Sequence, residues 1–136
     1  MPALQPATPT LVAIRAAHHS DTTPKYDRVV FEFSGAVPLL RIEYVKQLIA
    51  DGSGLPVPVT GRAILSVQLM PARAHNDRGQ VTAPQHLRLR LPIVKDIVSA
   101  GDFEAVVTYG IGVARKAETR ILTMASASRV VVDFIL

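Results

Sequence analysis

The chain has 136 residues, of which 49% are hydrophobic and 19% are charged, and this composition predicts one globular domain rather than a disordered segment. It contains no cysteine, which excludes disulfides, cysteine nucleophiles and cysteine-ligated zinc. Fifteen Lys and Arg residues against 11 Asp and Glu residues give a net charge of +4, which favours anionic partners but does not define a function.

Residues 1–9 are predicted to form an extended linker, because Pro, Ala and Thr dominate them. The folded domain is expected to span residues 10–136. No signal peptide is recognisable in residues 1–15, since no basic segment precedes an apolar run, and no stretch approaches the roughly 20 apolar residues of a membrane-spanning helix. The chain is therefore either a cytosolic protein or a trimmed piece of an exported one.

The first half of the domain carries strand patterns. Residues 10–14 predict a short strand, and residues 26–34 predict the clearest one, because Val29, Phe31 and Phe33 alternate with polar residues. Residues 38–47 alternate in the same way and are expected to pair with 26–34 as an antiparallel neighbour. The next features are a turn at 51–54, an extended edge at Pro56 and Pro58, and a strand over 62–70.

The second half begins with a long polar loop over residues 71–84. Residues 92–100 show apolar side chains at helical spacing, with Pro92 at the first position and Gly101 after the last, which predicts a short helix or helical turn. Strands are expected over 103–109, 120–124 and 129–135. We therefore predict an all-β, single-domain β-sandwich of about seven or eight short strands with one short helix or helical turn; a flattened barrel is the alternative.

Histidines and carboxylates are the first candidates for chemistry. No spacing among the four histidines demands a metal site, so no metal is predicted. A hydrolytic site around His75, Asp77 and His86 is kept as an alternative. Asp102 and Glu104 are interpreted as exposed strand positions, and Asp133, which lies in an apolar strand, as a salt-bridged or exposed residue.

Motifs of the common enzymes are absent. Gly52-Ser53-Gly54 lacks the spacing of a nucleophile elbow, and Gly110-Ile111-Gly112 lacks the third glycine and the following helix of a dinucleotide site. No Walker pattern is present. We therefore predict that the protein is not an enzyme and uses no cofactor.

Basic residues are the remaining candidates for a binding site. Eleven of the 15 are arginine, the side chain that holds carboxylate and phosphate through two parallel hydrogen bonds. We predict a ligand-binding rim formed by Arg73, Arg78, Arg88 and Arg90. Nucleic acid is not expected as a partner, because aromatic residues make up only 5% of the chain and stacking platforms need exposed rings.

Several segments resemble the AMIN and AMIN-like domains. Residues 26–35, Tyr-Asp-Arg-Val-Val-Phe-Glu-Phe-Ser-Gly, look like the opening strand of the family, and residues 119–123 and 128–134 are similar to its final strand pair. Residues 41–45, 51–54 and 101–104 resemble the AMIN-like domains of actinobacterial lipoproteins, and the likeness covers about residues 24–136. The family commonly has a proline before the Arg of the last strand, whereas this chain has Ala125-Ser126-Ala127-Ser128.

The resemblance implies a β-sandwich outside the cytoplasmic membrane, in the cell envelope, within a secreted protein or a lipoprotein whose anchor lies upstream of residue 1. AMIN domains target amidases and secretin assemblies to the envelope and are thought to contact peptidoglycan. The leading hypothesis is a non-catalytic module that binds peptidoglycan or another anionic wall polymer. The alternative is a protein–protein interaction domain that recruits an envelope protein or pairs two copies through a strand edge.

Overall fold

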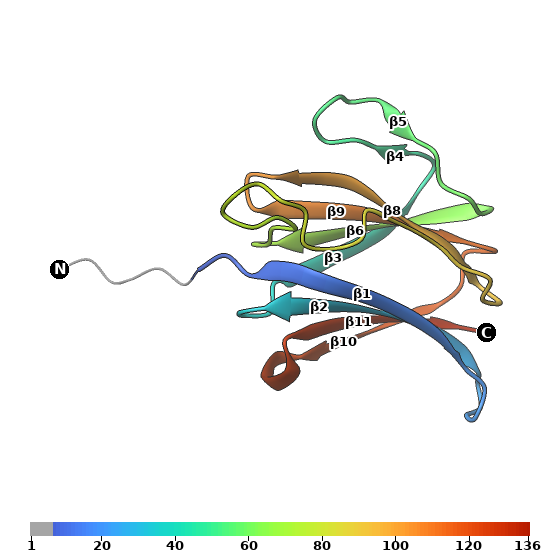
Figure 1. Ribbon diagram of the computed structural model, residues 1–136. Coiled ribbons are helices and arrows are strands. Elements are labelled where there is room, and N and C mark those ends of the chain that lie inside the picture. The colour runs from blue at the N-terminus through green and yellow to red at the C-terminus, as the bar shows by residue number, and fades with distance from the viewer. Residues whose placement is uncertain (1–6) are drawn as a thin grey trace.

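A computed structural model describes residues 7–136, so most of the predicted linker lies outside the described residues. The described residues form two antiparallel sheets that face each other (Figure 1) and a small third sheet. The four-stranded sheet has the order β1-β2-β11-β10, with β1 at Thr10–His19, β2 at Tyr26–Ser34, β11 at Arg129–Ile135 and β10 at Thr119–Met124.

The five-stranded sheet has the order β3-β6-β9-β8-β7, with β3 at Leu39–Val45, β6 at Ala63–Met70, β9 at Val106–Val113, β8 at Val94–Phe103 and β7 at His86–Arg88. The third sheet is the hairpin of β4 (Leu48–Ile49) and β5 (Pro56–Val57). A 3-10 turn, η1 (Ala125–Ala127), connects β10 to β11. The predicted all-β sandwich is confirmed.

The core lies between the two large sheets because alternate residues of their central strands point inward. Val29, Phe31 and Phe33 of β2 are buried, as their alternation predicts. The Phe31 ring packs at a tilt against the Tyr109 ring of β9, with 5.9 Å between the ring centroids. Burying each side chain of this size contributes about 1.5–3 kcal/mol to folding, so the central strands hold the sandwich together.

Strands β2 and β3 are not neighbours, and the expected pairing of residues 26–34 with 38–47 is wrong. The chain crosses from one sheet to the other after Gly35, whose φ of +106° suits glycine. β2 pairs instead with β1 and with β11, about a hundred residues further along the chain. Alternation identifies the buried face of a strand but carries no information about its partner.

The predicted helix over residues 92–100 is also wrong, because this segment is the start of strand β8. Val94 and Ile97 face the main core, whereas Val98 and Ala100 pack with Leu48 in a second apolar cluster. Register shifts interrupt the pairing of β8 with β9 at two places. Both faces of β8 are buried, and the bulges shift its alternation. Apolar residues therefore recur at a spacing that is also typical of a helix.

The β4–β5 hairpin covers the outer face of the five-stranded sheet and creates that second cluster (Figure 1). Glycine in β9 permits the close contact: a Cβ on Gly110 would lie 2.5 Å from the Leu48 side chain. The outer face of the sheet is therefore partly buried around β8 and β9. Among residues 7–136, no helix is long and apolar enough to cross a membrane.

Candidate functional site

Two clefts lie at opposite ends of the five-stranded sheet. One, the histidine cleft, has a volume of about 400 Å³ and is lined by Ala7, Thr8, Arg73, His75, Asp77, Glu104 and Ala105. The other, the cationic cleft, has a volume of about 500 Å³ and is lined by Tyr44, Val45, Lys46, Gly61, Arg62, Ala63, Ile64 and Lys116. The eight residues of β6 separate them, a distance of about 26 Å at the usual rise of a strand.

The histidine cleft is built on the segment that follows β6. Arg73 is fixed by backbone hydrogen bonds, since its N–H donates to Pro9 and its carbonyl accepts from Leu11 of β1. Asp102 near the end of β8 accepts a hydrogen bond from the Ala74 N–H at 3.1 Å and another from Nδ1 of His75 at 2.6 Å. The segment is thus attached to both large sheets.

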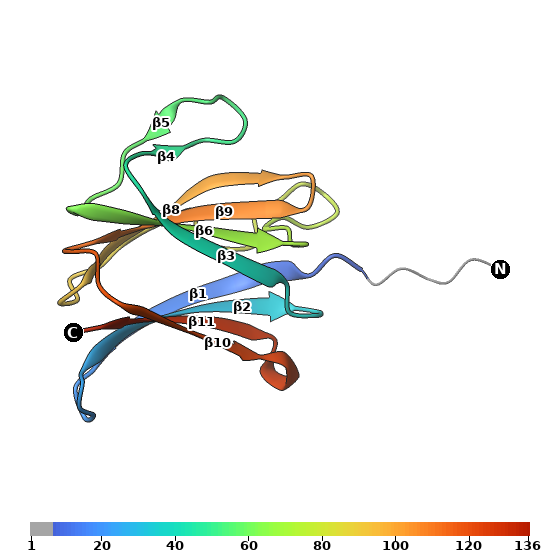
Figure 2. The same cartoon turned by 180° about the vertical axis from the view of Figure 1, so that it is seen from behind.

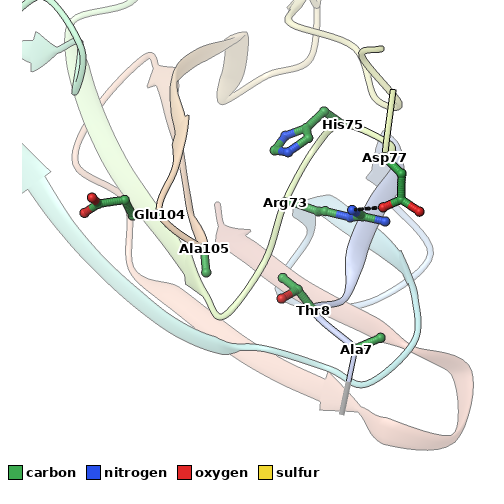
Figure 3. A pocket seen from close by; sticks show the side chains of 7 residues that line it. All are labelled: Ala7, Thr8, Arg73, His75, Asp77, Glu104 and Ala105. Carbon is green, nitrogen blue, oxygen red and sulfur yellow. Dashed lines mark hydrogen bonds and ion pairs between the residues drawn. The ribbon is translucent and has the colours of Figure 1, made fainter. Parts of the chain in front are cut away.

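Arg73 is already neutralised within this cleft. Its Nη1 lies 2.7 Å from Oδ1 of Asp77, and its Nε donates to the Thr10 hydroxyl at 2.9 Å. The hydrogen bond from Arg73 lowers the pKa of the Asp77 carboxyl below its usual value. Figure 3 shows the His75 ring turned away from this ion pair. Glu104 is also in the lining, so two carboxylates lie beside the charge of Arg73 and the cleft is a poor receptor for an anion.

The β8–β9 turn forms one wall of the histidine cleft. Glu104 and Ala105 have φ values of +51° and +64°, which is the left-handed conformation required of both residues in a tight two-residue hairpin. The predicted strand over 103–109 is therefore interrupted, and Glu104 lies at a turn rather than on a strand face. Asp102 is not a solvated strand position either, because two hydrogen bonds engage its carboxylate.

The other histidine–aspartate pairs are structural. His18 bonds to Asp27, which also accepts the backbone N–H groups of Ile93 and Val94. His86 bonds to Asp96, which also accepts the N–H of Thr60. Each aspartate thereby joins segments from different parts of the chain, which satisfies buried backbone donors.

The alternative hydrolytic site is not assembled. His75 and Asp77 line one cleft, but His86 is held by Asp96 near the start of β8. Serine and cysteine, the usual nucleophiles, are missing from the described residues that line the histidine cleft. Among residues 7–136, no group of three or more potential ligands is arranged to hold a metal ion.

The four predicted arginines form two separate pairs. Arg73 and Arg78 follow the end of β6, whereas Arg88 lies in β7 opposite Asp96 and Arg90 follows it, near the start of β8 at the other end. Arg78, Arg88 and Arg90 are exposed and form no ion pair with the described residues. They are thus available to a ligand, whereas Arg73 is engaged.

The outer face of the four-stranded sheet carries a network of paired charges. Asp133 of β11 holds Arg28 of β2 at 2.8 Å and Arg120 of β10 at 2.8 Å. Of the two expected alternatives, salt-bridged or exposed, the salt bridge is confirmed, and the Asp133 side chain is buried. Burial alone raises the pKa of Asp133, but the hydrogen bonds and the positive charges of the two arginines together lower it more, so that the pKa lies below its usual value. Glu32 forms similar ion pairs with Arg15 and Arg129.

The cationic cleft was not predicted from the sequence. Lys46 follows β3, Arg62 precedes β6 and Lys116 follows β9, so no local motif contains all three. All three residues are exposed, and no carboxylate is among the described residues that line the cleft. In the sequence, each of the three cations lies at a strand end. The strand order is needed to show that these strand ends lie side by side.

Comparison with known proteins identifies the family. The sequence model of the AMIN-like domain matches residues 9–135, which includes β1 and extends the resemblance noted above. AMIN-like domains are generally non-catalytic modules associated with the cell envelope. Searches of curated proteins and of solved structures gave no match. Because the match covers nearly the whole chain and the β-sandwich fits it, the protein belongs to the AMIN-like domain family.

Proposed function

We propose that this domain is an extracytoplasmic binding module that attaches to an anionic polymer of the cell wall, such as peptidoglycan. The full-length protein would be secreted or anchored by a lipid. Membership of the AMIN-like family supports an envelope location, and the distribution of charge supports an anionic ligand.

One observation carries the proposal: several exposed cations form no ion pair with the described residues. Glu32, Asp77 and Asp133 hold five arginines between them. A further set of exposed cations has no ion pair with the described residues, and it includes Lys46, Arg62, Arg78, Arg88, Arg90 and Lys116. The surplus charge of +4 is therefore available at the surface to attract a polyanion.

Sedimentation with purified, insoluble sacculi tests this proposal. We expect the domain to pellet at low salt and to return to the supernatant near about 0.5 M salt, where the screening length falls well below its value of about 10 Å at 0.1 M. The triple change Arg78→Gln, Arg88→Gln and Arg90→Gln should weaken retention, and Arg73→Gln alone should not. A wild-type domain that stays in the supernatant at every salt concentration would refute the proposal.

A second function is favoured by the edge strand β10, which is the outermost strand of its sheet. Edge strands are normally protected by charged residues, proline or a bulge. β10 (Thr119–Met124) has no proline and pairs with β11 without a register shift, and its one charged residue, Arg120, is held by Asp133. Ile121, Leu122 and Met124 are exposed hydrophobic residues. An apolar groove of about 650 Å³ beside this edge is lined by Val37, Leu39 and Leu40 among others.

The partner that fits this edge best is a second copy of the chain. If two β10 strands pair antiparallel about Ile121, Arg120 of one copy faces Leu122 of the other, so that no like charges oppose each other. Figure 2 shows β3 and β10 along the same side of the sandwich, where the second copy would dock. Light scattering should detect a dimer that Leu122→Lys disrupts; a strict monomer at high concentration would argue for a different envelope protein or none.

A further inference from the structure

The cationic cleft has a rigid frame. The Arg62 N–H donates to the Val113 carbonyl at 2.9 Å, and a Cβ on Gly61 would lie 2.7 Å from the Val113 nitrogen. The Tyr44 hydroxyl donates to the carbonyl of Ala117 at 2.7 Å. The segments that carry Arg62 and Lys116 are thereby attached to β9 and β3, which holds their backbones in place before any ligand binds.

The charges in this cleft are unbalanced. Lys46, Arg62 and Lys116 line one cavity without a carboxylate, and Glu43 and Glu118, the acids nearest in sequence, form no ion pair with the described residues. Like charges that share a cavity repel each other. No ion pair with the described residues offsets this repulsion, whereas a bound anion would.

The chemistry of the lining favours phosphate over carboxylate. A carboxylate offers one negative charge on two oxygens, whereas a phosphate group offers up to about two charges on three acceptor oxygens and can bond to several cations at once. Three cations line this cleft. The walls also contain apolar side chains, Val45, Ala63 and Ile64, which would contact the organic body that carries the phosphate. The volume of about 500 Å³ lies within the usual range for ligand pockets.

We infer that the cationic cleft is a phosphate-binding site and that Lys46, Arg62 and Lys116 hold a phosphate group of an envelope polymer. That the phosphate belongs to a cell-wall polymer rests on the proposed function. The site itself rests on the geometry of the cleft.

Calorimetric titration with inorganic polyphosphate tests the site. The affinity for poly-glutamate, measured at matched ionic strength, shows how a polymer of carboxylates binds in comparison. The double variant Arg62→Gln with Lys116→Gln removes two cations of the cleft. Its control, Lys25→Gln with Arg41→Gln, removes two exposed cations that have no ion pair with the described residues and do not line the cleft. We expect the cleft variant to lose about tenfold in polyphosphate affinity and the control less than threefold, as surface charge contacts usually contribute.

Equal losses in the two variants would overturn the site, because binding would then depend only on net charge. Tighter binding of poly-glutamate than of polyphosphate would overturn the preference for phosphate. The sacculus assay separates the two proposals. If wild type and the cleft variant pellet equally, the polymer-binding function stands and the cleft is not its site. If wild type binds polyphosphate through the cleft but never pellets, the site stands and the wall-polymer function fails.

Discussion

The histidine cleft and the cationic cleft are similar in size and lie at opposite ends of the same sheet, yet only the histidine cleft has its basic residues paired with acids. In the first, Arg73 and His75 are each hydrogen-bonded to an aspartate. In the second, three cations share a cavity with no acid in its lining. A basic residue therefore signals a ligand only where the fold has not already supplied its counter-ion.

The largest expected effect is loss of the frame of the cationic cleft. Gly61 has a φ of +142°, and an added Cβ would lie within 3 Å of the backbone of Gly112 and Val113. Gly61→Ala should therefore cost about 4 kcal/mol of folding free energy, since both backbone strain and a steric clash oppose it. Urea denaturation measures the loss, and Gly79→Ala, at a positive φ with open space around it, is the control and should cost much less.

Removing the acid from a buried network of paired charges should have the next largest effect. Asp133→Asn leaves Arg28 and Arg120 without their carboxylate and should cost about 3 kcal/mol at neutral pH. Because the pKa of Asp133 in the folded state lies below the usual 3.8, its contribution is fully present above that pH and is lost as the pH falls through the folded-state pKa. Unfolding measured from pH 7 to pH 2 should show the stabilities of wild type and variant converging at the acidic end. A constant gap would contradict the ionic origin.

Within the histidine cleft the effect should be smaller. Asp102→Ala removes the acceptor of both the Ala74 N–H and the His75 ring and should cost about 2 kcal/mol. The loss should appear in thermal unfolding, and hydrogen exchange should show faster exchange at Ala74. Retention on sacculi should be unchanged once the variant is folded; reduced retention would mean that this cleft, too, takes part in binding.

The smallest effect on stability should come from the cationic cleft itself. Arg62→Gln removes a side chain that is exposed and forms no ion pair with the described residues, so the change in stability should stay within about 0.5 kcal/mol. Arg73→Gln should cost about 1 kcal/mol, because Arg73 bonds to Thr10 and Asp77. If the two arginine variants were equally destabilised, the contrast between paired and free cations would fail.

Parts of this fold follow from the sequence with little ambiguity. The alternation in β2 correctly predicts the buried faces of Val29, Phe31 and Phe33, and the sum of such segments predicts the β-sandwich. The segment 92–100 is the exception. Its apolar spacing depends on a hairpin that packs on the outer face of β8, and nothing within the segment itself reveals that second buried face.

The sequence by itself determined the fold class, the family and the surplus of positive charge, because these depend on local alternation, short motifs and composition. The tertiary structure alone decided which strands pair, which arginines meet an acid and which cations converge. Lys46, Arg62 and Lys116 are up to 70 residues apart (116 minus 46) in the sequence, and Arg28 and Asp133 are 105 apart. Contacts over such separations depend on the strand order, which alternation within each strand does not encode.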